Sequence, residues 1–128
     1  MAATDEARPD TRHAGAQKVF FLCLTRPADG VGQPELRPHL QEHKKWVAEQ
    51  EREGRVFVAG PLLDEDYHSF GSGVLVIRAR SLAEARQVFD SDPFHAQGLR
   101  TYELWPWQIN EGSFRLHATW SGGTFEIE

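Results

Sequence analysis

Hydrophobic and polar positions vary along this chain in patterns that predict strands and helices in turn. Val19 to Leu24 is a continuous apolar run of strand length, so both faces of this strand should be covered. Arg55 to Ala59, Val74 to Ala79 and Leu99 to Ile109 are rich in aromatic and β-branched residues and are predicted strands. Pro106 marks the last of them as an edge strand or the site of a bulge.

The segment from Glu35 to Glu53 has the period of a helix, and Gly54 supplies its C-terminal stop. At about 100° per residue, one stripe along this helix is formed by Leu36, Leu40, His43 and Val47. His39 and Trp46 lie on one shoulder of the stripe. His43 is therefore predicted to point inward, between apolar neighbours.

A second helix is predicted from Ser81, which forms a capping box with Glu84. This helix must end by Asp92, because the residue before a proline avoids the helical region. Pro27 to Pro34 and Leu62 to Gly73 carry turn-forming and charged residues and are predicted loops.

The order strand, helix, strand, strand, helix, strand predicts an α+β fold of the ferredoxin-like βαββαβ type. Two helices cover one face of such a sheet, yet both faces of the Val19–Leu24 strand are apolar. A second copy of the same sheet would cover the open face, so we expect a homodimer with its sheets packed face to face.

Both ends of the chain extend beyond this predicted domain of residues 17–112. Residues 1–16 are polar, lack apolar periodicity and are predicted to form a disordered arm. Residues 113–128 alternate apolar and polar side chains on both sides of Ser121-Gly122-Gly123, which predicts a β-hairpin. This hairpin should extend its own sheet or cross onto the second subunit.

Composition narrows the possible partners and location. The net charge of −5 is modest and the basic residues are scattered, which argues against nucleic acid as a partner. No apolar segment reaches transmembrane length and the N-terminus has no signal-peptide core, so we expect a cytoplasmic protein with no membrane partner. Cys23 is the single cysteine and lies in an apolar run, which is typical of a buried, inert thiol.

His43 and Asp92 are the candidate catalytic residues. A neutral imidazole oriented by a carboxylate can take and return a proton near neutral pH. The alternative for His43 is a core histidine that bonds a backbone carbonyl. The alternative for Asp92, which precedes Pro93, is a turn or cap residue that binds backbone N–H groups, and this role can coexist with a catalytic one.

Several stretches resemble the YCII-related (YciI-like) family. They are Arg37-Pro38-His39-Leu40 through His43, Gly54-Arg55-Val56-Phe57-Val58-Ala59-Gly60-Pro61, Ser81-Leu82-Ala83-Glu84-Ala85 and Asp92-Pro93-Phe94-His95-Ala96-Gln97-Gly98. The resemblance covers about residues 17–110. It implies a dimeric α+β barrel of ferredoxin-like subunits, with a proposed histidine–aspartate dyad that falls on His43 and Asp92. His39 has no place in the family pattern.

The family includes a dehydrochlorinase that acts on a chlorinated hydroxyquinol. The ending Trp107-Gln108-Ile109-Asn110-Glu111-Gly112, followed by an extra hairpin, resembles that subgroup. The resemblance implies an aromatic or quinone-like small-molecule substrate.

Other residues are candidates for binding the substrate. They are His39, Trp46, Gly60, Pro61, Phe70, His95, Trp105 and Trp107. For each aromatic residue, packing in the core or in a dimer interface is the alternative. His39 and His43 are spaced to hold a metal, but no recognised helical zinc motif follows, so we expect neither a metal nor an organic cofactor.

These observations predict a small cofactor-independent enzyme in which His43 is the base or acid and Asp92 orients it. Lyase chemistry is the first expectation, followed by isomerisation or cofactor-free oxygenation. The rival hypothesis is a non-catalytic module that binds a small ligand through the same two residues.

Overall fold

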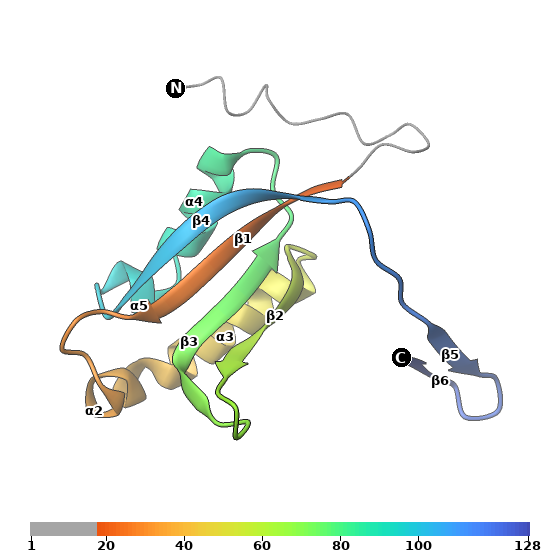
Figure 1. Ribbon diagram of the computed structural model, residues 1–128, viewed down its shortest axis with the longest axis horizontal. Coiled ribbons are helices and arrows are strands. Elements are labelled where there is room, and N and C mark those ends of the chain that lie inside the picture. Colours follow the sequence, from red (N-terminus) through yellow and green to blue (C-terminus); the bar gives the residue numbers. More distant parts are fainter. Residues whose placement is uncertain (1–17) are drawn as a thin grey trace.

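The sheet at the centre of the fold has four antiparallel strands in the order β2-β3-β1-β4. The strands are β1 (Lys18–Pro27), β2 (Val56–Leu63), β3 (Ser69–Ile77) and β4 (Arg100–Ile109) (Figure 1). This computed structural model describes residues 18–128, and the predicted arm of residues 1–16 lies outside them. The strand order, with helices between β1 and β2 and between β3 and β4, is the predicted ferredoxin-like α+β arrangement.

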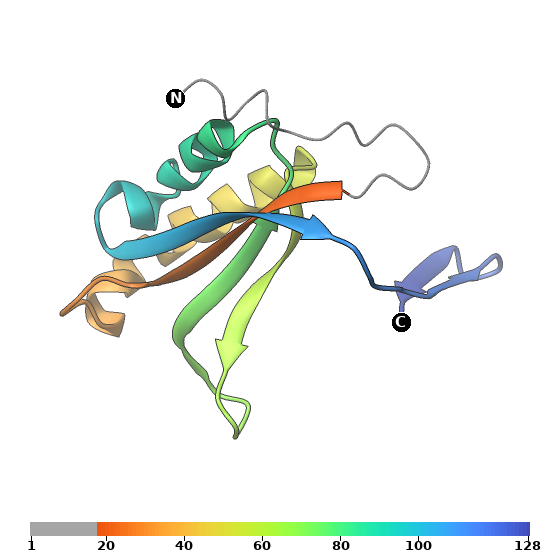
Figure 2. The same ribbon diagram turned by 45° about the horizontal axis from the view of Figure 1, so that its top comes forward.

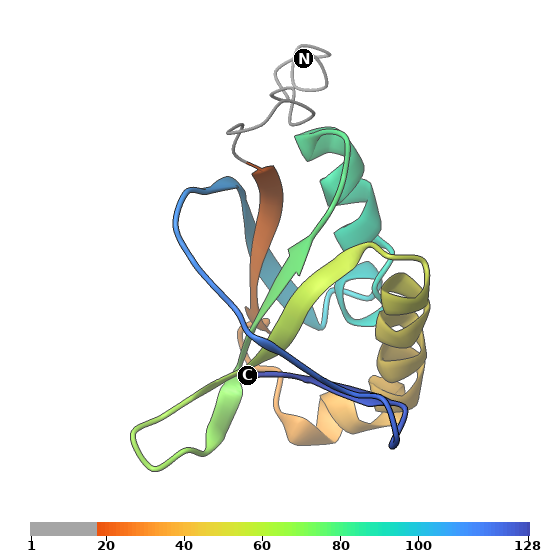
Figure 3. The same ribbon diagram turned by 90° about the vertical axis from the view of Figure 1, so that its right-hand side faces the viewer.

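Helices lie against one face of this sheet, as Figures 2 and 3 show. The first group comprises α2 (Gln33–Leu36), the 3₁₀ turn η1 (Arg37–His39) and α3 (Leu40–Arg52). The second group comprises α4 (Leu82–Asp90) and α5 (Pro93–Ala96). Within residues 18–128, none of these helices is both long and apolar enough to cross a membrane.

The helix predicted over residues 35–53 is interrupted near its start. Pro38 lies within η1 and has no N–H to donate to an α-helical bond, which accounts for the 3₁₀ turn there. Beyond it, α3 runs unbroken to Arg52. Gly54 follows with a φ of 78°, so the predicted stop is confirmed.

The loop predicted from Leu62 to Gly73 is wrong for most of its length. β2 continues through Gly60 and Pro61 to Leu63, and β3 already begins at Ser69. Pro61 is tolerated because β2 is an edge strand, where a missing N–H costs no ladder bond. Only residues 64–68 form the turn, in which Asp64 Oδ1 accepts from the backbone N–H of Asp66 and of His68.

The core lies between the helices and the inner face of the sheet. Its buried members are Phe21, Cys23, Trp46, Leu75, Ile77, Ala79, Ala85 and Phe89. Odd-numbered positions of β1 face this core, as the alternation of a strand requires. The core therefore anchors α3 and α4 against β1 and β3.

Within residues 18–128, no helix lies against the opposite face of the sheet (Figure 3). Trp107 is paired with Phe20 and Trp105 with Leu22, and the two tryptophans are 42% and 48% exposed. Phe57 also lies on this face, with its ring centroid 4.6 Å from that of Phe20. Phe20 itself is only 5% exposed, but Phe57 and the two tryptophans around it leave an exposed apolar surface, and we expect a second copy to cover it.

The C-terminal segment forms a hairpin of β5 (Leu116–Thr119) and β6 (Thr124–Ile127). It stands away from the sheet in Figures 1 and 2. Its large apolar side chains are exposed, from 59% for Leu116 to 100% for Trp120. Docking of this hairpin onto its own sheet edge or onto a second copy stays a prediction.

Candidate active site

A cavity of about 390 Å³ lies between α3 and the β2–β3 pair. One wall is the predicted inward stripe of the first helix: Leu36, Leu40, His43 and Val47. Gly60 and Pro61 of β2 line it from the sheet, and Phe94 and Arg100 also contribute to its lining. The volume falls within the range of about 300–1,000 Å³ that is usual for small-molecule sites.

Asp92 begins α5 as its N-cap residue. Pro93 favours an extended conformation at the preceding residue, and Asp92 has φ −61° and ψ 128°. Its Oδ1 accepts from the backbone N–H of Phe94 at 3.0 Å. The side chain is nearly inaccessible, since Asp92 is only 1% exposed. The local sequence thus places this carboxylate, buried, at the N-terminus of the short helix α5.

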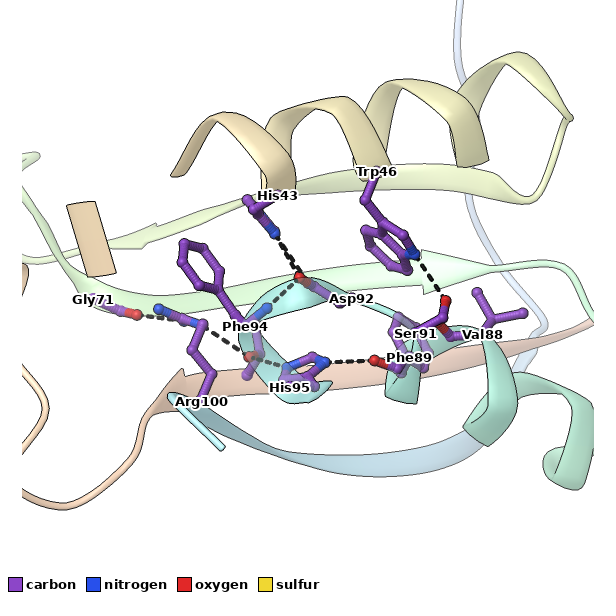
Figure 4. A network of polar contacts seen from close by, with 11 residues as sticks. His43, Trp46, Gly71, Val88, Phe89, Ser91, Asp92, Phe94, His95 and Arg100 are labelled. Atoms are coloured by element: carbon purple, nitrogen blue, oxygen red, sulfur yellow. Dashed lines mark hydrogen bonds and ion pairs between the residues drawn. The ribbon is translucent and has the colours of Figure 1, made fainter. Parts of the chain in front are cut away.

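His43 contacts this carboxylate across the interior (Figure 4). Its Nδ1 lies 3.0 Å from both Oδ1 and Oδ2 of Asp92. Because a carboxylate accepts, Nδ1 carries the proton, which leaves Nε2 of the neutral ring as a free acceptor. The ring stacks on Phe94 at 4.6 Å between centroids, and its side chain stays 24% exposed. The Asp92 carboxylate can therefore hold His43 so that its Nε2 serves as a proton acceptor at the cavity wall.

Arg100 also lines the cavity, and two bonds fix its guanidinium. Its Nε donates to Oγ1 of Thr25 at 3.1 Å and its Nη2 to the carbonyl of Gly71 at 2.6 Å. Burial lowers the pKa of Arg100 from its ordinary value, and the charge of Asp92 opposes that shift. An arginine remains charged in either case. The cavity therefore has a positive charge on its wall.

His95 does not line the cavity but is linked to Arg100 through Thr25. Its Nδ1 lies 2.8 Å from the carbonyl of Phe89, and its Nε2 lies 2.8 Å from Thr25 Oγ1. Burial lowers the pKa of His95, so its ring is neutral near neutral pH. Nδ1 then donates to Phe89, and Nε2 accepts from the hydroxyl of Thr25.

Sequence patterns single out neither Arg100 nor Thr25. An arginine at the start of a strand and a threonine at the end of an apolar run are both common. Only the pairing of β1 with β4, which places Pro27 opposite Arg100, brings the two side chains together. The one available signal in the sequence was Thr25 itself, a polar residue that directly follows the apolar run of β1.

The predicted substrate-binding residues divide into two groups. Gly60 and Pro61 line the cavity. The others lie elsewhere in this chain: His39, Trp46, Phe70, His95, Trp105 and Trp107 are not among the residues that line it. Trp46 is in the core, where its Nε1 donates to Ser91 Oγ at 2.8 Å, because its shoulder of α3 faces the sheet and α4. Trp105 and Trp107 point to the helix-free face, since they alternate with the core-facing Leu104.

His39 and Cys23, the candidates for metal and thiol chemistry, lie outside the cavity lining. His39 Nδ1 lies 3.2 Å from the side-chain amide of Gln97, away from the cavity lining. Within residues 18–128, no group of three or more histidine, cysteine or acidic side chains is arranged to hold a metal. Cys23 is fully buried as predicted, and burial raises its pKa to about 12.

These features define a ferredoxin-like α+β domain in which a buried carboxylate holds a histidine at a small cavity. The family model of the YCII-related domain matches residues 19–108, and the chain belongs to the YCII-related family. Among solved structures, the chain is similar to the 5-chloro-2-hydroxyhydroquinone dehydrochlorinase of Burkholderia phenoliruptrix AC1100, in complex with 2,5-dihydroxybenzoquinone.

The two chains share 22% sequence identity and a TM-score of 0.52. The match covers 69% of this chain and 92% of the dehydrochlorinase. At this identity the likeness concerns the fold. No curated protein matches this chain.

Proposed function

We propose that this protein is a small enzyme that carries out acid/base chemistry on a small aromatic or quinone-like substrate, with no metal or organic cofactor. The observation that carries the proposal is the contact of His43 Nδ1 with the buried carboxylate of Asp92, on a side chain that lines the cavity. Family membership and the fold shared with a dehydrochlorinase support an enzyme of this kind.

In the proposed reaction, His43 Nε2 removes a proton from a hydroxyl or an acidic carbon of the substrate. Asp92 holds the ring in the tautomer that leaves Nε2 free, and it stabilises the imidazolium that forms. Once the carbon that carries the leaving group is tetrahedral, as in a keto tautomer of the ring, the electron pair left on the substrate expels that group as its anion, so the net change is loss of one acid molecule. Isomerisation follows the same first step, but the proton returns to another carbon.

A specific observation keeps a binding-only role as the second candidate. Asp92 also caps α5 through Phe94, so its burial has a structural reason apart from catalysis. In that case His43 and Asp92 would serve as hydrogen-bonding partners of a bound ligand.

The test compares His43→Gln with His39→Gln, four residues earlier and outside the cavity lining. Chloride release from 5-chloro-2-hydroxyhydroquinone should fall by about 10²–10⁴-fold in the first variant and persist in the second. Binding of 2,5-dihydroxybenzoquinone should change far less than turnover. Undiminished release in His43→Gln would contradict the proposal. Binding without turnover in the wild type, lost in His43→Gln, would favour the binding-only role.

A further inference from the structure

We propose that Arg100 forms an anion-binding subsite that recognises an ionised oxygen of the substrate, such as an enolate, a phenolate or a carboxylate. The inference rests on the proposed function, because it assigns the substrate class of the same cavity. Arg100 is the one permanently charged side chain among the described residues that line this cavity, and no carboxylate is among them. The nearby carboxylate of Asp92 is already engaged with His43 and Phe94.

Arg100 has more donors than the protein uses. A guanidinium carries five N–H donors, and the described residues take one from Nε and one from Nη2. Within the described part of the chain, no buried side-chain nitrogen or oxygen lacks a partner. The unused donors of this half-buried side chain therefore reach open space, and the cavity is the open space that Arg100 lines.

The guanidinium is held in place by a chain of bonds with a defined direction. His95, neutral and donating from Nδ1 to Phe89, accepts at Nε2 from Thr25. The oxygen of Thr25 then has lone pairs for the Nε–H of Arg100. Gly71 supplies the second anchor through its carbonyl. A cation held in this way is prepared to receive an anion without losing its own freedom on binding.

The position of Arg100 relative to His43 suits one bound ligand. Phe94 lies between the two residues (Figure 4). The His43 ring stacks on Phe94 at 4.6 Å, and the Arg100 guanidinium carbon lies 5.9 Å from the same ring centroid. A flat ligand in the cavity can therefore offer a proton to His43 and an ionised oxygen to Arg100. An anionic oxygen would pair with the one permanent charge on the cavity wall.

The test measures equilibrium binding of a matched pair of probes by titration calorimetry. One probe is 2,5-dihydroxybenzoquinone, which is ionised near neutral pH, and the other is its uncharged dimethoxy counterpart. Wild-type protein should bind the ionised probe more tightly. Arg100→Gln should weaken that binding by about tenfold to a hundredfold and leave the neutral probe unchanged. Arg26→Gln is the matched control, since Arg26 lies next to Thr25 but is exposed and outside the cavity lining.

Two further variants keep the result interpretable. Arg100→Lys retains the charge without the fork of donors and should keep part of the preference, which covers the case that Arg100→Gln does not fold. His43→Gln should lose turnover and keep the preference for the ionised probe. Equal binding of the two probes by wild type, or no binding of the ionised one, would overturn the subsite. That result would leave the role of His43 standing, because the assay measures no turnover.

Discussion

Asp92 makes two bonds that can be separated by substitution. One carboxylate oxygen caps α5 at Phe94, and both oxygens lie 3.0 Å from His43 Nδ1. Asparagine caps a helix about as well as aspartate does. Its NH₂ group, however, would face the N–H of His43 and favour the tautomer in which Nε2 carries the proton.

We therefore expect Asp92→Asn to lower turnover by about 10²–10⁴-fold with little loss of stability. Asp92→Ala should lose the cap as well, at a cost of about 1 kcal/mol in the free energy of unfolding. Steady-state turnover and urea denaturation measure the two effects independently. A variant Asp92→Asn that keeps full turnover would limit Asp92 to its capping role.

His95 gives the stability of the fold a predictable pH dependence. Burial lowers its pKa in the folded protein below the ordinary value of 6.5. Below about pH 6.5, the unfolded chain binds a proton that the folded chain does not, so the free energy of unfolding falls as pH falls. Above that pH neither the folded nor the unfolded chain binds this proton, so His95 causes no loss of stability there.

We expect His95→Gln to flatten this acid-side loss of stability, because glutamine does not titrate. His68→Gln is the control, since His68 is exposed in the turn of residues 64–68. Urea midpoints measured from pH 7.5 down to pH 5 give the comparison. If both variants follow the wild-type curve, another group causes the acid loss.

The position of a side chain can be predicted from the sequence when it is set by residues close to it along the chain. His43 and the lining stripe follow from helical period, and the conformation of Asp92 follows from Pro93. Arg100, Thr25 and His95 meet only through the folded sheet, so no local pattern marks them as a group. The position of Trp46 in the core could not be predicted either, because the helical period of α3 does not say which side of its apolar stripe packs against the core.

At the scale of elements, strands and helices were predicted wherever apolar periodicity was continuous. The ends of β2 and β3 next to the turn were missed because Gly60, Pro61 and Gly71 are ordinary turn residues that here lie inside strands. Their tolerance depends on the position of each strand in the sheet, which is a property of the whole fold. The short turn of residues 64–68 is explained by Asp64, whose side chain accepts from two backbone N–H groups.

Gly71 is the position in this hairpin where glycine is required. Its φ is 99°, and a Cβ there would lie 3.3 Å from Pro27. Gly71→Ala should therefore lower the free energy of unfolding by about 1–3 kcal/mol and loosen the carbonyl that holds Arg100. Gly60→Ala is the matched control on the neighbouring strand, because a Cβ there meets nothing within 4 Å. Denaturation midpoints that fall equally in both variants would contradict this account.

At the scale of the whole molecule, the described residues 18–128 present two exposed apolar surfaces. One is the helix-free face of the sheet, which includes Phe57, Trp105 and Trp107. The other is the face of the C-terminal hairpin that carries Leu116 and Phe125. Exposed apolar surface of this kind typically marks an interface. The sequence predicted the first surface from the continuous apolar run of β1 and the second from the alternation of residues 113–128, but neither pattern specifies what covers the surface.

We expect the full chain to sediment as a homodimer at micromolar concentration, with the hairpin docked on the second copy. An isolated two-stranded hairpin is at best marginally stable in water, so its apolar side needs a partner. Removal of residues 113–128 should then weaken the dimer and increase the binding of a hydrophobic dye. The double variant Trp120→Ser/Phe125→Ser should have the same effect, whereas His117→Ser/Glu126→Ser alters a pair on the opposite face and should not. Sedimentation equilibrium gives the dissociation constants. A monomeric full chain would refute the dimer, and a truncated chain with unchanged association and thermal stability would show that the hairpin has no part in it.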